Sequence, residues 1–556
     1  MPKAMPRLIL MFMLAAVCAA SSAADTADIV LVNGKIVTVD DRFGIAQAVA
    51  IKGQRVFAVG TTSDVRKLAG PGAKVIDLRG RTVIPGLIDN HAHFVRVAEK
   101  WHSEVRLDGV TSRIQALAMI RERVRAAKSG EWIVVLGGWS EEQFTDDPRG
   151  FPLAELDRLA PENPVALQAI YRHTYLNTAA LKAAGIDEKT PEPSGGRIEK
   201  DAAGKLTGMV SGAGGVAFVA AKVPLAEKQQ WLQNARNVVA FLNSVGMTTW
   251  MDAGGRGVGS EHYEPYRELA QRGELNARVF WQTVRQPGTP QQVDQVLAEI
   301  PTMKPFQGSD YFDNVGYGEA VYSAVNTQLL SPKANTRAED MAQWGRIVRA
   351  VAQQGLYLNA HVEMQPAIDA FLTLYEDVHR EKPIKGLRWA FSHIDQVTLE
   401  QIERMKRLGM SAQIHTRPLI QGSLMHKFHG DRAWSMPPMR LVQDSGIMWG
   451  LGSDATAVTT SNPFYNLWFA VTGKMVGGKQ VNRQTITREE ALIAHTRNNA
   501  YIVFQESNLG SLQPGKYADL LVLDRDYLTV PADQIKDIRP VLTMVGGKVV
   551  YEAKNP

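Results

Sequence analysis

Short apolar segments alternate with longer segments of helical periodicity through most of the chain. Apolar residues spaced three and four apart predict helices at 114–128, 225–245, 338–354, 399–408 and 488–504. Short apolar runs predict buried strands at 132–136, 165–169, 248–252, 277–283, 356–361, 387–393 and 447–452. Such alternation is typical of a parallel sheet, and over a stretch of this length it predicts an α/β fold whose sheet closes into a barrel.

The two ends of the chain have a different pattern, with apolar residues that alternate or form short runs between glycine turns. They predict strands at 28–40, 48–60, 74–84, 518–524 and 545–552. We therefore expect one small sheet domain built from both termini, residues 25–85 and 506–556, around a barrel at 86–505. Because a barrel needs only about 250 residues, we also expect an insertion at about 110–230, which includes the Gly/Pro-rich stretch 185–215.

The first residues have the composition of a secretory signal peptide. Lys3 and Arg7 precede an apolar run at 8–20, and small residues follow before Asp25. We expect removal of residues 1–24, which places the mature protein in the periplasm or outside the cell. Cys18 is the only cysteine and lies in this segment, so the mature chain would form no disulfide. A lipoprotein anchor at Cys18 is the alternative, although residues 15–17 make a poor processing site.

The charge balance argues against some classes of partner. The 62 basic and 57 acidic residues give a net charge of +5, and loss of the signal peptide would lower it further. This charge is too small and too evenly spread to indicate nucleic-acid binding. No later apolar stretch is long enough to span a bilayer. We expect a small-molecule substrate. Whether the protein forms a homo-oligomer stays open.

Histidine and aspartate residues end several of the predicted strands. His91 and His93 follow the apolar run 83–89, and residues two apart on a strand point to the same side. His361 and His393 each end a predicted strand, and Asp454 follows another. In a barrel the carboxyl ends of the strands form the active site. Each residue alone could be an ordinary strand-end or helix-capping residue, but together they predict a metal centre.

These residues stand in motifs that resemble the amidohydrolase superfamily, in particular its type 3 branch with the N-substituted formamide deformylases. The resemblance extends over nearly the whole mature chain and includes PGLIDNHAH at 85–93, GSDA at 452–455 and EEALIAHTRNNA at 489–500. It implies a distorted (β/α)8 TIM-like barrel with a metal centre at its C-terminal mouth and a β-sandwich formed from both termini. It places His91 and His93 on strand 1, His361 on strand 5, His393 on strand 6 and Asp454 on strand 8.

Many relatives bridge two metals with a carboxylated lysine on strand 4, and the corresponding segment 311–322 contains no lysine. Some branches use a glutamate instead, so we expect Glu319 to bridge, with Asp313 as the second candidate. A surface or salt-bridged Glu319 is the alternative reading. Without a bridge, the centre would hold one metal rather than two.

Imidazole and carboxylate ligands suit zinc, and they also bind manganese, cobalt or iron. The resemblance implies hydrolysis of a C–N amide bond by metal-activated hydroxide, with Asp454 as the general base and then the general acid. We expect an N-substituted formamide or a related small amide as the substrate. N-acyl amino acids and peptide-like or cyclic amides are the alternatives. The alternative outside the class of enzymes is a binding protein that holds a metal and catalyses no reaction.

Substrate contacts are expected from loops and strand ends that the resemblance places near the mouth. For each of them, packing or surface exposure is the competing role. The candidates are Trp139, Tyr171, His173, Arg197, Tyr317, Tyr322 and His415. No Gly-x-Ser-x-Gly motif of serine hydrolases is present, and the glycine clusters match neither phosphate-loop pattern.

Overall fold

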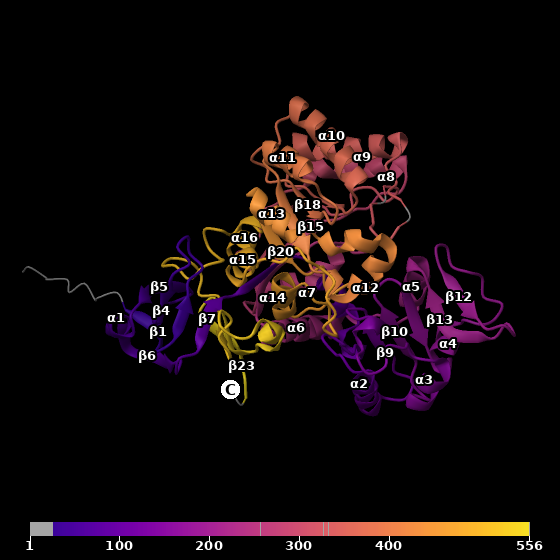
Figure 1. Ribbon diagram of the computed structural model, residues 1–556, viewed down its shortest axis with the longest axis horizontal. Coiled ribbons are helices and arrows are strands. Elements are labelled where there is room, and N and C mark those ends of the chain that lie inside the picture. The colour runs from indigo at the N-terminus through magenta and orange to yellow at the C-terminus, as the bar shows by residue number, and fades with distance from the viewer. Residues whose placement is uncertain (1–25, 256, 326, 332, 555–556) are drawn as a thin grey trace, which may run out of the picture.

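The computed structural model describes residues 26–255, 257–325, 327–331 and 333–554. The expected signal peptide and Cys18 lie outside these residues. Within them, no helix combines the length and the hydropathy needed to cross a membrane. Figure 1 shows three regions side by side, with the terminal sheets at one end, a central α/β body, and a separate sheet with its own helices at the other end.

In the described part of the chain, the central body contains eight strands in two four-stranded sheets, and every neighbouring pair is parallel. The first sheet has the order β16-β15-β14-β8 and the second β17-β18-β19-β20. A parallel bridge between Tyr317 and Leu358 links the first sheet to the second at one side. At the other side, the Asp454 N–H donates to the His91 carbonyl at 2.9 Å.

The strands of the central body are short, as buried parallel strands usually are. They are β8 (Leu87–Ala92), β14 (Met247–Asp252), β15 (Arg278–Thr283), β16 (Phe312–Tyr317), β17 (Asn359–Val362), β18 (Ala390–His393), β19 (Ser411–His415) and β20 (Trp449–Gly452). The helices around them are α6 (Lys228–Ser244), α7 (Glu264–Gln271), α8 (Pro290–Glu299), α9 (Ala338–Gln353), α10 (Gln365–Glu381), α11 (Leu399–Arg407), α12 (Pro418–His429), α13 (Met439–Ser445), α14 (Pro463–Thr472), α15 (Arg488–Ala494) and α16 (Arg497–Ile502).

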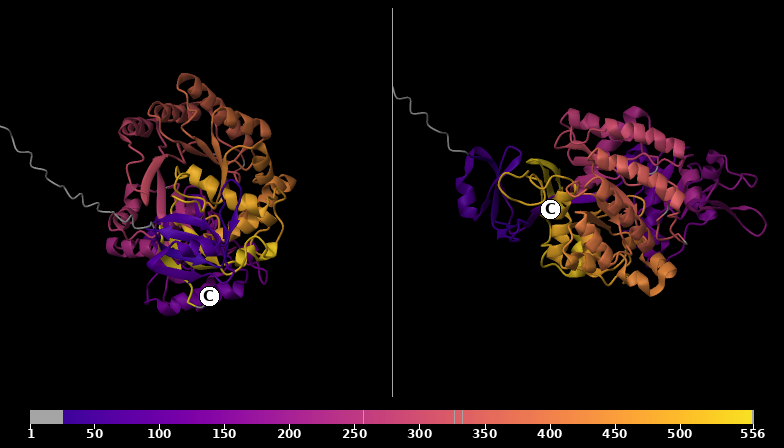
Figure 2. Two further views of the ribbon diagram at one scale, coloured as in Figure 1. Left: turned by 90° about the vertical axis from the view of Figure 1, so that its left-hand side faces the viewer. Right: turned by 90° about the horizontal axis from the view of Figure 1, so that it is seen from above.

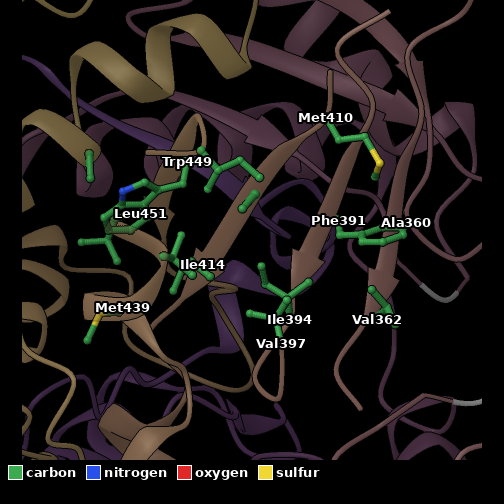
Figure 3. Packing of buried hydrophobic residues seen from close by; sticks show 14 of the residues in the cluster. Ala360, Val362, Phe391, Ile394, Val397, Met410, Ile414, Met439, Trp449 and Leu451 are labelled. Carbon is green, nitrogen blue, oxygen red and sulfur yellow. The ribbon is translucent and has the colours of Figure 1, made fainter. Parts of the chain in front are cut away.

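The main hydrophobic core lies between the second sheet and the helices that cover it. Figure 3 shows Phe391, Ile394, Ile414 and Leu451 along neighbouring strands of this sheet, and all four are fully buried. On the helix side, the Trp344 ring of α9 stacks on Phe371 of α10 with 4.0 Å between the ring centroids. Burial of these residues fixes the strands, and therefore the side chains at their ends, in one arrangement.

The terminal segments form two further sheets, of order β5-β4-β1-β6 and β23-β22-β21-β7-β2-β3. In the second of these, β7 pairs with β2 on one side and with β21 on the other, so the two ends of the chain share a sheet (Figure 2). The elements are β1 (Ala27–Val32), β2 (Lys35–Val37), β3 (Ile45–Ala46), β4 (Ala48–Lys52), β5 (Arg55–Gly60), α1 (Thr62–Lys67), β6 (Ala69–Asp77), β7 (Thr82–Pro85), β21 (Leu520–Leu523), β22 (Pro540–Val545) and β23 (Lys548–Glu552).

Several expected elements are divided in the structure, among them 28–40 into β1 and β2 and 48–60 into β4 and β5. The stretch 74–84 breaks into β6 and β7, which belong to different sheets, because Arg79 and Gly80 turn the chain with φ values of 51° and 82°. The expected helix 488–504 breaks into α15 and α16 at Thr496, whose φ of −132° and ψ of −84° are not helical. This break lets the His495 carbonyl accept a hydrogen bond from Ile88 N–H of β8.

The third region follows β8 in the chain and has its own five-stranded sheet of order β12-β13-β11-β10-β9. Its elements are α2 (Arg113–Ala126), β9 (Ile133–Leu136), α3 (Leu153–Leu159), β10 (Val165–Ala169), β11 (His173–Leu176), α4 (Thr178–Ala184), β12 (Arg197–Lys200), β13 (Leu206–Ser211) and α5 (Ala213–Ala220). It lies at the end of the molecule opposite the terminal sheets (Figures 1 and 2).

Candidate metal centre

The residues expected to bind metal stand at the carboxyl ends of parallel strands. His91 lies in β8 and His93 directly follows that strand, while His361 lies in β17 and His393 ends β18. Glu319 comes two residues after β16, and Asp454 two residues after β20. The carboxyl ends of parallel strands meet at one edge of a sheet, so residues far apart in the sequence lie near one another here.

The imidazole and carboxylate groups of these residues converge. His91 Nε2 lies 3.3 Å from Glu319 Oε2, and His93 Nε2 lies 3.0 Å from Asp454 Oδ1. The same Glu319 oxygen is 3.1 Å from His361 Nδ1 and 3.4 Å from His393 Nε2. All of these residues except His361 are buried. The structure therefore brings together the side chains that the sequence singles out, although their role as ligands stays a prediction.

Glu319 presents its two oxygens to different partners. Oε2 faces His91, His361 and His393, whereas Oε1 lies 3.7 Å from His93 Nε2. A carboxylate in this position could span two cations. Asp313, the second candidate, lies near the amino end of β16, where its Oδ1 accepts the Gly308 N–H of the preceding loop at 2.8 Å.

The donor atoms fit a divalent cation. Ligand atoms of His91, His93 and Asp454 lie within 4.8 Å of one another, and so do those of His91, Glu319 and His393. His91 Nε2 is buried and makes no hydrogen bond of normal geometry among the residues that the structure describes, although Glu319 Oε2 lies 3.3 Å away. A buried nitrogen without a partner is costly in free energy, and coordination by a metal would satisfy it.

The ring nitrogens that point away from this cluster have partners of their own. His91 Nδ1 lies 3.1 Å from Ser392 Oγ, and His93 Nδ1 lies 2.9 Å from the Gly254 carbonyl. His393 Nδ1 is 2.8 Å from Nδ1 of His415. Such contacts fix the orientation of each ring, and metal-binding histidines nearly always have them.

A second group of charged residues, which the sequence analysis missed, supports His361. Glu363 Oε1 lies 3.1 Å from His361 Nε2 and 2.5 Å from both terminal nitrogens of Arg417. Arg417 Nη2 is also 3.9 Å from Asp395 Oδ2, and its Nη1 is 3.7 Å from Asp454 Oδ2. Glu363 follows β17 and Arg417 comes two residues after β19. This position beyond a strand end is the one signal that could have identified them.

Electrostatics keep both central carboxyl groups ionised. Burial alone would raise the pKa of Glu319, but the neighbouring His91, His361 and His393 hold this pKa well below its usual range. Burial likewise opposes ionisation of Asp454, and the hydrogen bond from His93 with the charges of nearby histidines lowers its pKa below the usual value. Two carboxylates are therefore available as ligands or as proton acceptors.

Backbone conformation also sets the direction of two of these side chains. His393 and Asp454 have φ values of 78° and 65°, which lie in the left-handed region that residues other than glycine seldom occupy. Strained conformations of this kind are retained where the surrounding structure holds them, and they concentrate at functional sites.

The candidates for substrate contact lie in different surroundings. His415 is buried against the metal cluster, with its ring centroid 4.4 Å from that of His91. His173 pairs with Glu141 at 2.6 Å. Trp139 is fully buried and stacks on Phe144. Packing of this kind gives no support to a substrate contact for Trp139, and the roles of His173 and His415 stay predictions.

The remaining candidates also differ in exposure. Tyr317 and Tyr322 are buried in the main hydrophobic core, which does not support a substrate contact for either. Arg197 is exposed and lies 3.5 Å from Glu199. Tyr171 is exposed at the turn between β10 and β11, where its hydroxyl contacts Arg96.

Known proteins resemble this chain along nearly its whole length. An N-substituted formamide deformylase of Arthrobacter pascens is 29% identical, covering 94% of this chain and 98% of its own. A metal-dependent hydrolase of Pyrococcus furiosus has a similar structure, with a TM-score of 0.64, 20% identity and coverage of 90% and 100% of the two chains.

A second solved structure, a variant of the atrazine chlorohydrolase TrzN of Arthrobacter aurescens with zinc and atraton, has a TM-score of 0.52 at 16% identity, covering 95% and 96%. These likenesses indicate a TIM-barrel-like α/β fold. The sequence model of the amidohydrolase family matches residues 74–551. The chain therefore belongs to the amidohydrolase family and is a metal-dependent hydrolase that acts on C–N bonds.

Proposed function

We propose that the protein is exported and hydrolyses the amide bond of a small amide, an N-substituted formamide or a close relative. The observation that carries this proposal is the convergence of four histidines with Glu319 and Asp454 at the ends of parallel strands. The likeness to a formamide deformylase supports the substrate class. The apolar run at 8–20, with small residues before Asp25, supports export to the periplasm.

We also propose zinc as the metal, with one or two ions per chain. His91, His93 and Asp454 would hold one ion, His361 and His393 would hold a second, and the Glu319 carboxylate would serve both. When bound, the metal supplies a Lewis acid and lowers the pKa of water from about 16 to about 7. We further propose that the two sheets of the central body form one closed (β/α)8 barrel with this centre at its mouth. The terminal sheets would form a β-sandwich.

Asp454 is the residue that moves the proton. Its carboxylate has a low pKa and lies 3.0 Å from His93 Nε2, at the same edge as the other donors. In this position Asp454 accepts a proton from the attacking water and passes it to the leaving nitrogen. Amide hydrolysis requires that second transfer, because an unprotonated amine anion is a very poor leaving group.

The test is hydrolysis of a panel of amides by zinc-loaded protein, with the products identified by mass spectrometry. The panel contains N-substituted formamides, N-acyl amino acids and cyclic amides, and chelator-treated protein is the control. We expect release of an amine and a carboxylic acid from at least one class, and formate from a formamide. Protein that binds zinc but hydrolyses no amide would be a metal-holding binding protein and would contradict the proposal.

A further inference from the structure

Asp252 ends β14 and is fully buried, although it is not one of the expected metal ligands. In the described part of the chain no basic side chain pairs with its carboxylate, which instead accepts three hydrogen bonds. Val95 N–H donates to Oδ2 at 3.0 Å, and Oδ1 accepts from Gly254 N–H at 3.0 Å and from the Tyr263 hydroxyl at 3.1 Å. Burial of a carboxylate is costly unless such donors satisfy it, and a satisfied polar group of this kind makes its surroundings rigid.

Two of these donors belong to the surroundings of His93. Val95 comes two residues after His93 in the chain, and the Gly254 carbonyl lies 2.9 Å from His93 Nδ1. A carbonyl oxygen can only accept a hydrogen bond, so Nδ1 donates and Nε2 is the nitrogen that faces the metal cluster. The Asp252 carboxylate therefore closes a ring of hydrogen bonds. This ring runs from the His93 imidazole through Gly254 and Asp252 to Val95, and back along the chain to His93.

The side chains around this ring leave it little freedom. Tyr263, which donates to Asp252, is buried and stacks on Trp281 with 4.4 Å between the ring centroids. Gly254 has a φ of 72°, and a Cβ there would lie 2.5 Å from Val284 Cγ2. No other residue fits this position without a shift of its neighbours. The Gly254 carbonyl is thus held in one place, with Asp252 bound to the N–H of the same residue.

We propose that Asp252 is a positioning residue that fixes the His93 imidazole in the orientation needed to bind the metal, with Tyr263 holding the carboxylate. The inference rests on the proposed metal centre and adds to it a residue that is not a ligand. Partners of metal-binding histidines typically change metal affinity by about 10- to 100-fold. The partner of His93 is a backbone carbonyl, which no substitution removes, so the side chain that holds this backbone segment takes over that role.

The experiment compares metal binding by full-length wild type, Asp252→Asn and Tyr263→Phe. Asparagine keeps the size of the side chain, but its NH2 group cannot accept a hydrogen bond from a backbone N–H. Competition with a chromogenic chelator gives the zinc affinity, and the visible absorption of cobalt-substituted protein reports the ligands around the ion. Urea unfolding shows whether each variant is folded. Asp157→Asn is the matched control, because Asp157 also accepts a backbone N–H, from Thr178 at 2.7 Å, in the third region.

We expect Asp252→Asn to bind zinc about 10- to 100-fold more weakly than wild type and to shift the cobalt absorption bands. Tyr263→Phe should change both properties in the same direction by less, and Asp157→Asn should match wild type. Wild-type zinc affinity in folded Asp252→Asn would overturn the proposal, and so would weaker affinity with unchanged cobalt bands. If Asp252→Asn does not fold, wild-type values in Tyr263→Phe would overturn it. Wild type that binds neither metal would refute the metal centre itself, and this inference with it.

Discussion

Asp454 is expected both to contact the metal and to carry the proton, and these two tasks can be separated. Asparagine keeps an oxygen that can bind a cation, but it cannot accept a proton. We therefore expect Asp454→Asn to retain most of its metal while its kcat falls by about 10² or more. Steady-state kinetics and elemental analysis measure the two properties. Asp444→Asn, at an exposed pair with Arg440, is the control, and full activity of Asp454→Asn would refute the assignment.

Glu363 acts through His361, because its carboxylate lies 3.1 Å from the ring nitrogen that faces away from Glu319. Removing this charge should leave His361 less basic and less well oriented. We expect Glu363→Gln to weaken zinc affinity by about 10- to 100-fold, measured by competition with a chromogenic chelator. Glu381→Gln, which alters an exposed pair with Arg349, should leave the zinc affinity unchanged. Unaltered affinity in Glu363→Gln would show that this contact has no orienting role.

For single residues, the sequence indicated the expected metal ligands, which converge, but not the charged residues that contact these ligands. His91, His93, His361, His393 and Asp454 could be singled out because each ends an apolar strand. Glu363 and Arg417 also follow strands, but a charged residue after a strand is ordinary on any surface. Only their pairing in space, between segments 54 residues apart, distinguishes them.

At the scale of elements, β8 and β20 approach each other too closely for side chains at some positions. Asp89 Oδ1 of β8 accepts hydrogen bonds from Ser453 N–H and from His91 N–H, each at 3.1 Å. A Cβ on Gly452 would lie 2.9 Å from this same oxygen, and closer still to Asn90 Oδ1. The contact between these strands places His91 and Asp454 beside each other.

We expect Gly452→Ala to destabilise the protein by about 1–3 kcal/mol, because overpacking a rigid core forces strain into its surroundings. Urea unfolding followed by circular dichroism measures the change. Gly60 lies at the end of β5, and a Cβ there would meet nothing within 4 Å, so Gly60→Ala should stay within about 0.5 kcal/mol of wild type. Equal midpoints for wild type and Gly452→Ala would contradict the close approach of these strands.

Periodicity predicted most elements, but it failed where contacts between distant segments determine where an element ends. The helix at 338–353 could be predicted within one residue because its apolar face is continuous. The break at Thr496 could not, since it depends on a hydrogen bond between the His495 carbonyl and β8, far away in the sequence. The division of 74–84 into two strands has the same origin, because the two halves pair with different sheets.

For the whole molecule, a buried ion pair joins the central body to the terminal sheets. Arg278 of β15 donates from Nε to Asp519 Oδ2 at 2.8 Å and from Nη2 to Asp519 Oδ1 at 3.0 Å, and both side chains are buried. Asp519 directly precedes β21. Alternation of strands and helices in the sequence predicted the central body, but it carries no information on which distant segments pair.

We expect Asp519→Ala to lower the free energy of unfolding by about 3–5 kcal/mol, because it leaves the Arg278 charge buried without a partner. Asp294→Ala removes an exposed partner of Arg346 and should cost at most about 1 kcal/mol. Urea unfolding of both variants gives the comparison. If the free energy of unfolding fell by a similar amount in the two variants, this would contradict a structural link between the central body and the terminal sheets.

Metal content is the most direct test, because the proposed chemistry depends on imidazole groups that share a cation. Elemental analysis of purified protein would compare wild type with the double variant His91→Ala/His93→Ala. His102→Ala/His379→Ala is the control, since neither histidine belongs to the cluster. We predict one or two divalent ions per chain in wild type and control, and almost none in the His91/His93 variant. Stoichiometric metal in that variant would show that the centre lies elsewhere.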